Sequence, residues 1–386
     1  MRLSIILAVC LVSTNVKADD LYLGHPSPSH YSVTMPFRLT NDSIYVDVHV
    51  KDNLHHFLLD TGAATLISPS FINKYKLNVT TNNFEFTDSN GSQGKVPIYY
   101  LPDIAIGKTI FSGYTASAFN GLDEKPFSCL NVSGIIGYNM LRDSVVTFDF
   151  INRKIKISDT PPKGLEDEGY FPIGFYFDGY NGPILHLWHN FGSLDVVLDT
   201  GSNGGITLNY PGLDSVLNDL GYKGQEIKGG VTYFAAAGGK ENENKSEIYK
   251  LTNFSLGRLN VKEFPVTVSN RAVESLVGVK FLKQYDIVLD FKASIAWLKP
   301  NGIITESLIR PSFGIYPTIK ENKFVVDAIL TGSKADLVGV LPNDHIIEAD
   351  KRNTNQLTDS DFCRLFLKSE YRSYTIEGEK STISLY

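Results

Sequence analysis

Cysteine is scarce in this sequence, with three among 386 residues. Cys10 lies inside the apolar N-terminal run, which leaves Cys129 and Cys363, and these two fall in different predicted domains. Exported domains that depend on disulfides are much denser in cysteine. The sequence therefore predicts that a disulfide framework does not stabilise this protein.

Long apolar runs and an excess of basic residues are also missing. After Ala18 no segment approaches the roughly 18 apolar residues that a membrane span needs. Asp and Glu (42) outnumber Lys and Arg (36), which gives a net charge of -6. This balance argues against a nucleic-acid partner and a basic membrane-binding face. The hydrophobic fraction of 42% is that of a globular protein, and the length suits two or three domains.

The first 18 residues (1–18) have the layout of a signal peptide. Arg2 supplies a positive charge, residues 3–12 are almost wholly apolar, and Val16-Lys17-Ala18 is a small-residue cleavage site. We therefore expect an exported protein, either periplasmic or secreted. Lipidation at Cys10 is disfavoured because Val9 is not small. The alternative to a signal peptide is a buried N-terminal helix.

A long internal repeat organises the rest of the chain. In the first copy, residues 45–50 alternate between apolar and polar, and the apolar residues 57–59 precede Asp60-Thr61-Gly62. In the second copy, residues 184–188 and 196–198 precede Asp199-Thr200-Gly201. Further landmarks match at a nearly constant offset: 101–107 with 251–257, 134–137 with 275–278, and 145–150 with 286–291. These patterns predict strands, so both copies should be mainly β.

Each copy also predicts one short helix after its Asp-Thr-Gly. In the first copy Ser68 is a candidate N-cap and Pro69 suits the first helical position, with the helix reaching Leu77. In the second copy residues 211–220 form the helix and Gly221 ends it. Residues 161–164 read as the linker between the copies.

The two Asp-Thr-Gly tripeptides are the candidate chemistry. An apolar strand that ends in Asp-Thr-Gly places a carboxylate at the tip of a buried hairpin, and glycine permits close backbone approach there. One such tripeptide is weak evidence because Asp-Gly turns are common. Two copies, each with the same strand before it and the same pattern after it, are strong evidence.

On these residues the chain resembles the retropepsin-like aspartic peptidases, in the bacterial-type arrangement with two lobes in one chain, here residues 31–160 and 168–300. The resemblance implies two homologous acid-protease β-barrel lobes that form one cleft. It implies that Asp60 and Asp199 are the catalytic pair and that no metal or cofactor takes part. Supporting roles carry over to Thr61, Gly62, Ala63, Thr200, Gly201 and Ser202.

Two further family elements have counterparts. The hydrophobic-hydrophobic-Gly element packed under each loop matches Ile135-Ile136-Gly137 and Leu276-Val277-Gly278. The glycine-bearing flaps would lie between these landmarks. The first would contain Asn90, Gly91 and Gly94, and the second Gly238 and Gly239. Ser275 stands where the first copy has Gly134, which is a departure from the repeat.

The resemblance also implies a mechanism. Two carboxyl groups held close together share one proton, and the ionised member activates a water molecule. The loops differ at one position, where Ala63 follows the first glycine and Ser202 the second. A Ser hydroxyl that donates to a carboxylate favours its charged form. We therefore predict that Asp199 is more often ionised and Asp60 more often protonated.

The tail, residues 303–386, has a different rhythm. It predicts strands at 324–330, 345–349, 374–376 and 382–385, a short helix capped by Ser333, and a second helix from Thr358 to about Leu367. This small α+β domain resembles a PDZ domain, in which Phe313, Gly314 and Ile315 would form the carboxylate-binding loop. The partner implied is a protein C-terminus added as a strand. The alternative is that the tail only braces the second lobe.

The function expected is hydrolysis of polypeptide substrates by an aspartic endopeptidase. Two alternatives remain open. The first is a binding protein that keeps the cleft and the PDZ-like domain without turnover, and the second is an enzyme covered by its own tail. His55-His56, His186 and His189 are interpreted as strand-surface residues and not metal ligands, because they lack a matching acidic or Cys partner.

Overall fold

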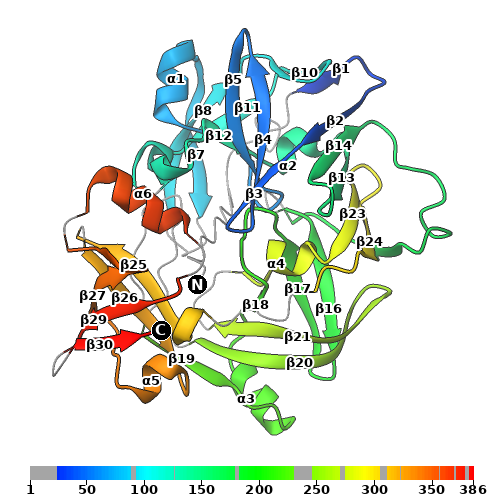
Figure 1. Ribbon diagram of the computed structural model, residues 1–386. Helices are drawn as coiled ribbons and strands as arrows, with labels where there is room; N and C mark the ends of the chain where they lie inside the picture. Colours follow the sequence, from blue (N-terminus) through cyan, green and yellow to red (C-terminus); the bar gives the residue numbers. More distant parts are fainter. Residues whose placement is uncertain are drawn as a thin grey trace.

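The computed structural model describes residues 24–87, 93–125, 127–178, 182–229, 246–269, 274–304, 311–321, 323–355, 357–368, 371–378 and 382–386. Within these ranges the chain is mainly β-structure, as predicted, and its strands form three sheets (Figure 1). None of the described helices has the length and apolar character needed to cross a membrane. We call residues 31–160 the first repeat, 168–300 the second repeat and 303–386 the tail.

The first sheet has eleven strands and contains the hairpin that leads to Asp60. That hairpin is β4 (Ser43–Val50) and β5 (Asn53–Leu59), and alternate residues of β4 are buried toward its end, as its sequence predicts. The other strands are β1 (His25–Ser27), β3 (Arg38–Thr40), β6 (Leu66–Ile67), β7 (Val79–Thr87), β8 (Gln93–Tyr100), β9 (Ile104–Ile106), β10 (Thr109–Ser112), β11 (Thr115–Ala118) and β12 (Gly134–Ile136).

The second repeat builds the matching elements in the same order along the chain. They are β16 (Ile184–His189), β17 (Gly192–Leu198), β18 (Ile206–Leu208), α3 (Leu213–Asp219), β19 (Gln225–Gly229), β20 (Ser246–Leu256), β21 (Leu259–Ser269) and β22 (Leu276–Val277). The strand before each Asp-Thr-Gly pairs in parallel with the strand before a later glycine, β5 with β12 and β17 with β22. Both repeats therefore have the same local topology around their aspartates.

The two predicted helices form with shifted ends. In α1 (Pro69–Tyr75) the Ser68 hydroxyl accepts from the Phe71 amide at 3.1 Å, as expected of an N-cap. This helix ends before the predicted Leu77 because Lys76 takes the left-handed conformation, with φ of 52°. Helix α3 starts two residues later than predicted because Gly212 is left-handed, and Gly221, with φ of 85°, follows its end.

A six-stranded sheet takes three strands from each repeat and joins them. Its order is β15 (Phe171–Gly174), β24 (Ile295–Pro300), β23 (Tyr285–Asp290), β13 (Val145–Asp149), β14 (Lys154–Ser158) and β2 (Ser32–Pro36). β13 and β23, which come from equivalent positions of the repeat, are the central antiparallel pair. Equivalent strands of the two repeats therefore occupy equivalent places on either side of this central pair.

The tail forms its four predicted strands and two predicted helices, and in addition one short 3₁₀ helix and two further strands. They are η4 (Ser312–Gly314), β25 (Ile315–Lys320), β26 (Lys323–Leu330), α5 (Lys334–Leu337), β27 (His345–Ala349), β28 (Arg352–Asn353), α6 (Asp359–Leu367), β29 (Tyr374–Glu377) and β30 (Thr382–Leu385). Ser333 caps α5, and Thr358 and Asp361 form a capping box on α6. The strands of the tail do not form a sheet of their own. β26 pairs with β19, so the tail extends the sheet of the second repeat to thirteen strands.

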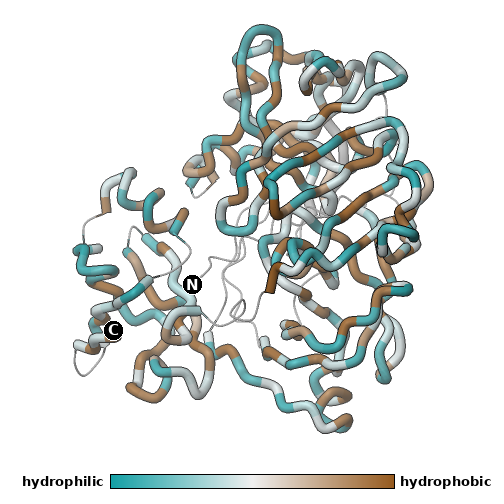
Figure 2. The backbone as a smooth tube through the Cα atoms, turned by 45° about the vertical axis from the view of Figure 1, so that its right-hand side comes forward, coloured by the Kyte–Doolittle hydropathy of each residue, from teal (hydrophilic) through white to brown (hydrophobic). Residues whose placement is uncertain are grey.

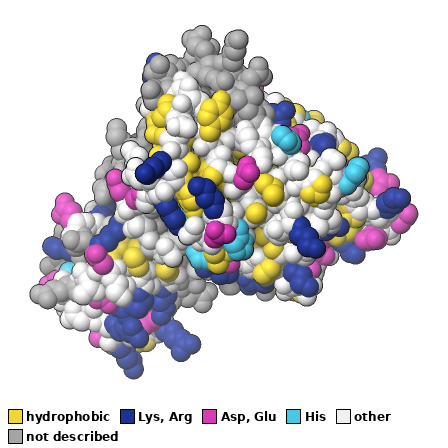
Figure 3. Space-filling view, turned by 90° about the horizontal axis from the view of Figure 1, so that it is seen from above, with side chains coloured by type: hydrophobic (Ala, Val, Ile, Leu, Met, Phe, Trp, Pro, Cys, Tyr) yellow, Lys and Arg dark blue, Asp and Glu magenta, His cyan; other side chains and the backbone are white. Residues whose placement is uncertain are grey.

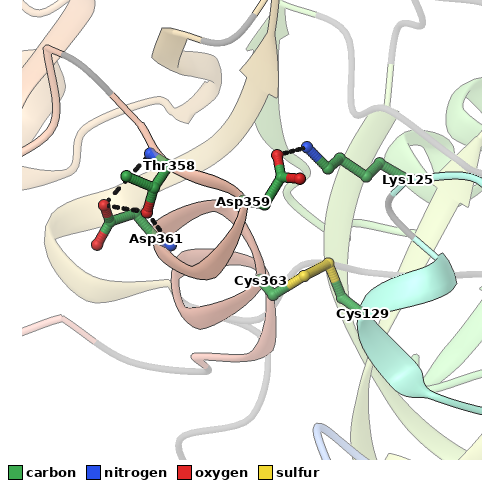
Figure 4. Close-up of a disulfide and its surroundings, with 6 residues drawn as sticks. All are labelled: Lys125, Cys129, Thr358, Asp359, Asp361 and Cys363. Atoms are coloured by element: carbon green, nitrogen blue, oxygen red, sulfur yellow. Dashed lines mark hydrogen bonds and ion pairs between the residues drawn. A yellow bond between two sulfur atoms is a disulfide. The ribbon is translucent and has the colours of Figure 1, made fainter.

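The prediction about cysteine was wrong. Cys129, in η3 (Phe127–Leu130) of the first repeat, forms a disulfide with Cys363 in α6 (Figure 4). The two cysteines do belong to different domains by sequence, but the tail packs α6 against the first repeat and brings the sulfur atoms together. One disulfide therefore links segments that are 234 residues apart in the chain.

Most buried apolar residues belong to one core that runs through the repeats and the tail. Figure 2 shows apolar and polar stretches alternating along the strands, as expected for sheets with one face on a core. Figure 3 shows Lys and Arg, Asp and Glu, and hydrophobic side chains together on one face of the molecule.

Candidate functional site

Asp60 and Asp199 lie at equivalent positions, one residue beyond the ends of β5 and β17. The Asp60 amide donates to the Ile136 carbonyl at 3.0 Å, and the Asp199 amide donates to the Val277 carbonyl at 3.0 Å. The parallel pairing of each strand with β12 or β22 therefore continues into the aspartate itself. Both aspartates are fully buried.

The two loops are joined by four reciprocal hydrogen bonds through Thr61 and Thr200. The Thr61 hydroxyl donates to the Leu198 carbonyl at 2.6 Å and accepts from the Thr200 amide at 3.1 Å. The Thr200 hydroxyl donates to the Leu59 carbonyl at 3.0 Å and accepts from the Thr61 amide at 3.0 Å. Each threonine thereby satisfies the backbone of the other loop, and all four bonds are buried.

The glycines of the two loops place the carboxyl groups face to face. A Cβ on Gly62 would lie 2.8 Å from the Asp199 Cγ, and a Cβ on Gly201 would lie 2.2 Å from the Asp60 Cγ. Each carboxyl group thus occupies the space that a side chain on the opposite glycine would need. Glycine is required here for close approach and not for a left-handed backbone.

Burial and proximity perturb both carboxyl groups. Burial, then the Asp199 charge, raises the pKa of Asp60 well above its usual value. Burial raises the pKa of Asp199 to about 6, and a side-chain hydrogen bond with Asp60, followed by the amides of Ser202 and Gly201, limits that rise. Among the described residues, Oδ2 of each aspartate has no hydrogen-bond partner. Two ionised carboxylates cannot donate to each other, so a hydrogen bond within the pair requires a proton on one of these oxygens. We therefore treat the two groups as one titrating unit.

The Ser202 hydroxyl does not donate to Asp199, so this part of the prediction was wrong. The Ser202 amide, not its hydroxyl, donates to Asp199 Oδ1, at 2.9 Å. The hydroxyl instead accepts from the Gly204 amide at 3.3 Å. In the first loop the Ala63 amide also lowers the pKa of Asp60, so an amide at this position acts on both aspartates.

The hydrophobic-hydrophobic-Gly elements pack under the loops, as the resemblance implies. A Cβ on Gly137 would lie 2.2 Å from the Ala63 carbonyl oxygen, and a Cβ on Gly278 would lie 2.6 Å from that of Gly204. The next residue in each case, Tyr138 or Val279, donates its amide back to the loop. Ser275, at the position equivalent to Gly134, lies just before β22, and its hydroxyl accepts from the Asn209 amide at 2.9 Å.

A buried polar network below the Asp60 loop was missed from the sequence. Asn139 Oδ1 accepts from the amide and the hydroxyl of Thr65, at 2.8 and 2.7 Å. Its Nδ2 donates to the Thr115 carbonyl, and the Thr65 hydroxyl accepts from the Gly137 amide. At the positions equivalent to Thr65 and Asn139, the second repeat has Gly204 and Lys280, and the Lys280 amide donates to the Gly204 carbonyl. The side-chain network of Asn139 with Thr65 therefore belongs to the first repeat. A single Asn within an apolar run, Ile135 to Leu141, was the signal that could have revealed it.

Gly182, just before β16, was also missed. A Cβ on this residue would lie 2.1 Å from the Thr61 carbonyl oxygen, so the segment that enters the second repeat packs directly on the first loop. The neighbouring Pro183 carbonyl accepts from the Leu198 amide at 2.8 Å. The Gly-Pro pair before a predicted strand is a weak signal for such a contact.

The other predicted site residues are the flap glycines, Asn90 and the loop of the tail. Asn90, Gly91, Gly238 and Gly239 lie outside the described residues, and Gly94 pairs with Phe86 near the end of the β7–β8 hairpin. In the tail, Phe313 and Gly314 have left-handed backbones, with φ of 60° and 85°, and Ile315 is buried at the start of β25. A Cβ on Gly314 would lie 2.1 Å from the Ser333 Oγ, so the loop is held against the cap of α5.

The histidines make ordinary protein contacts. His55 is buried, contrary to the expectation of a surface residue, with its ring nitrogens 2.6 Å from the Ser133 Oγ and 2.7 Å from the Tyr75 hydroxyl. Burial lowers the pKa of His55 to about 4. His56 contacts Asp47, His186 contacts Asp195, and His189 contacts Tyr222. Across the described ranges, no group of three or more His, Cys, Asp or Glu side chains is arranged to hold a metal ion.

Comparison with known proteins adds no relative: no family model matches the chain, and no curated protein matches it.

Proposed function

We propose that this protein is an aspartic endopeptidase that hydrolyses peptide bonds at Asp60 and Asp199. The reciprocal arrangement of the two Asp-Thr-Gly loops carries the proposal. The threonines lock the loops together, the glycines admit the opposing carboxyl groups, and both carboxyl groups lose their hydration. A structural role alone does not favour two buried carboxyl groups in contact, because burial of like charges is costly.

The proposed mechanism assigns a different role to each aspartate. We assign the ionised state to Asp199, whose Oδ1 accepts from the amides of Gly201 and Ser202, and it acts as the general base toward a substrate water molecule. Asp60 keeps its proton and donates it toward the scissile carbonyl oxygen. When the tetrahedral intermediate collapses, Asp199 gives the proton that it took from water to the departing amine nitrogen. Asp60 recovers its proton from the hydroxyl group that becomes the carbonyl of the product acid. The amides of Gly62, Gly201 and Ser202 donate to the Oδ1 atoms of the pair, which leaves both Oδ2 atoms for the reaction.

We propose further that the tail is a PDZ-like domain of an exported enzyme. Within the described residues the only strand that pairs with β25 is β26, which makes the other edge of β25 the place where an added strand would pair. The left-handed Phe313 and Gly314 immediately precede that strand, where a carboxylate-binding loop is expected. Pro317 lacks an amide donor and lies at a register shift in β25, so added pairing would be interrupted there.

Cleavage of a diverse peptide mixture tests the function. We expect the mature wild-type protein to cut peptides, and Asp60→Asn and Asp199→Asn each to abolish cutting. Asp47→Asn is the matched control, because Asp47 is a half-exposed strand carboxylate paired with His56. Persistent cleavage in either active-pair variant would contradict a shared aspartic site. Absence of cleavage by a folded wild type would favour a catalytically silent or autoinhibited binding protein.

The autoinhibited alternative has one observation in its favour, because neither aspartate is exposed at all. Deletion of the tail is an imperfect test of it, since β26 is a strand partner of β19 in the second repeat. Removing residues 303–386 would expose the edge of β19 and disturb the repeat itself. A change confined to the contact between the tail and the first repeat is more informative.

A further inference from the structure

The tail is bound to the second repeat by continuous sheet structure. Ile227, Lys228 and Gly229 of β19 pair with residues 328–330 of β26. The ladder continues beyond the strands, because the Thr331 amide donates to the Glu226 carbonyl at 2.9 Å. Two side-chain contacts add to this ladder. The Gln225 side-chain amide donates a hydrogen bond to the Thr331 carbonyl, and Lys228 forms an ion pair with Asp336 at 2.9 Å. This attachment does not depend on any single group.

The tail is bound to the first repeat in a different way, through α6. Cys363 is joined to Cys129, and one turn earlier Asp359 pairs with Lys125 (Figure 4). The Lys125 amine also lies over the Phe362 ring, 5.1 Å from its centroid. At the other end of α6, the Asn41 side chain donates to the Leu367 carbonyl at 2.8 Å.

These contacts with the first repeat are unequal in strength. The Asp359 side chain is 89% exposed and that of Lys125 is 36% exposed, so their attraction is screened by water. Asn41 adds a single partly buried hydrogen bond. The disulfide is therefore the dominant link, and unlike the β19–β26 ladder it can be broken by one chemical step.

We infer that the tail is a strap across both repeats and that the Cys129–Cys363 disulfide is its releasable fastening. While this disulfide is intact, the strap limits access to the Asp60–Asp199 pair. The inference deepens the proposed function and rests on it. The six-stranded sheet and the threonine bonds already join the repeats, so the strap is a second and independent link. Both carboxyl groups are fully buried, so a substrate reaches them only if surrounding elements move. A strap fixed to both repeats opposes that movement.

The release step is thiol–disulfide exchange with a dithiol, either a small molecule or a dithiol oxidoreductase. One thiolate of the dithiol attacks the sulfur of Cys129 or Cys363, forming a mixed disulfide and expelling the other cysteine as a thiolate. The second thiol of the reagent then closes its own disulfide and frees the remaining cysteine. Both cysteines become thiols after protonation and the dithiol is oxidised by two electrons. Both residues are half-buried, so the bond is not enclosed in the core.

Amide hydrogen exchange and peptide cleavage, measured on the full chain with and without a small dithiol, test the inference. On reduction we expect faster exchange in η3 and α6, while β26 remains protected by β19. Exchange at residues 60–65 and 199–205 should also rise, and kcat/KM for peptides should increase about fivefold or more. The double variant Cys129→Ser/Cys363→Ser should behave as the reduced protein and ignore the dithiol. Lys125→Ala, which keeps the disulfide, should behave as the oxidised wild type.

Several outcomes would overturn the inference. Unchanged exchange in α6 after reduction would show that the disulfide is not the fastening, and release by Lys125→Ala alone would show the same. Unchanged exchange at the two aspartate loops, or equal cleavage in both redox states, would show that the strap does not limit access. If neither state cleaves any peptide, the proposed function fails, and exchange at the loops still decides whether the strap covers the pair.

Discussion

Gly201 and Asp60 belong to different repeats, yet a Cβ on the glycine would lie 2.2 Å from the carboxyl carbon of the aspartate. Gly62 stands in the same relation to Asp199, at 2.8 Å. Each loop therefore shapes the space for the other loop's carboxyl group. Such a site cannot be assembled by one repeat alone.

Gly201→Ala should displace Asp60 and abolish cleavage, because the added methyl group overlaps the Asp60 carboxyl group. The four hydrogen bonds of Thr61 and Thr200 hold both loops in place, so neither loop can move to relieve the overlap. Gly62→Ala should reduce cleavage less, because its overlap with Asp199 is smaller. Gly204→Ala is the control, since its Cβ would meet only the Ser202 Oγ, at 3.4 Å. Steady-state kinetics with one peptide substrate decides the order, and an active Gly201→Ala enzyme would contradict it.

The raised pKa values predict that the aspartate pair destabilises the folded protein as pH rises. The pKa of Asp199 is about 6 when folded against 3.8 as the ordinary value, so between these pH values the folded state holds a proton that the unfolded chain has released. The penalty is absent below about pH 4, grows through this window and is complete above about pH 6. The pKa of Asp60 is also raised by burial, so Asp60 adds to the penalty.

Asp199→Asn should therefore gain stability over wild type by up to about 3 kcal/mol near neutral pH, and the gain should vanish near pH 4. Urea unfolding at both pH values measures this difference. A gain that is independent of pH would mean that Asp199 is not the group that titrates. Cleavage should depend on the same ionisation, with activity rising as the pH approaches about 6 from below.

Ser202→Ala should leave the pH dependence of cleavage almost unchanged. The bond to Asp199 comes from the backbone amide, which alanine keeps, and the lost hydroxyl serves the Gly204 amide. A pH–rate profile of the variant beside wild type provides the measurement. A shift of the acidic limb by about one unit, worth about 1.4 kcal/mol, would restore the hydroxyl as the cause.

The buried ion pair between Lys283 and Asp42, at 2.8 Å, should be costly to break from one side. The two side chains are only 12% and 5% exposed, so Lys283→Met leaves a carboxylate buried without this cation and should cost about 3 kcal/mol or more. Adding Asp42→Asn should recover most of the loss, because Asn also tolerates the left-handed backbone at position 42.

Lys250→Met is the control for these two variants. The Lys250–Glu263 pair has nearly the same separation, 2.8 Å, but its side chains are 65% and 48% exposed, so the variant should cost less than about 1 kcal/mol. Urea unfolding of the four proteins gives all the values. Equal losses for Lys283→Met and Lys250→Met would show that burial of the first pair has no energetic consequence.

Local features were the most predictable from the sequence. The caps at Ser68, Ser333 and Thr358 form as expected, because a cap depends on residues three positions apart in the chain. Strands β27 and β30 match their predicted limits. Errors of two residues arose where Lys76 and Gly212 adopt left-handed conformations, which ended α1 early and delayed α3.

The sequence by itself determined the duplication, the two Asp-Thr-Gly loops and their order along the chain, because these are patterns of neighbouring residues repeated in register. Only the tertiary structure decided which distant groups meet. The pairing of Cys129 with Cys363, the union of β19 with β26 and the network of Asn139 with Thr65 each depend on how whole elements pack. Packing is set by the sum of many apolar contacts across the core, and no short stretch of sequence contains that sum.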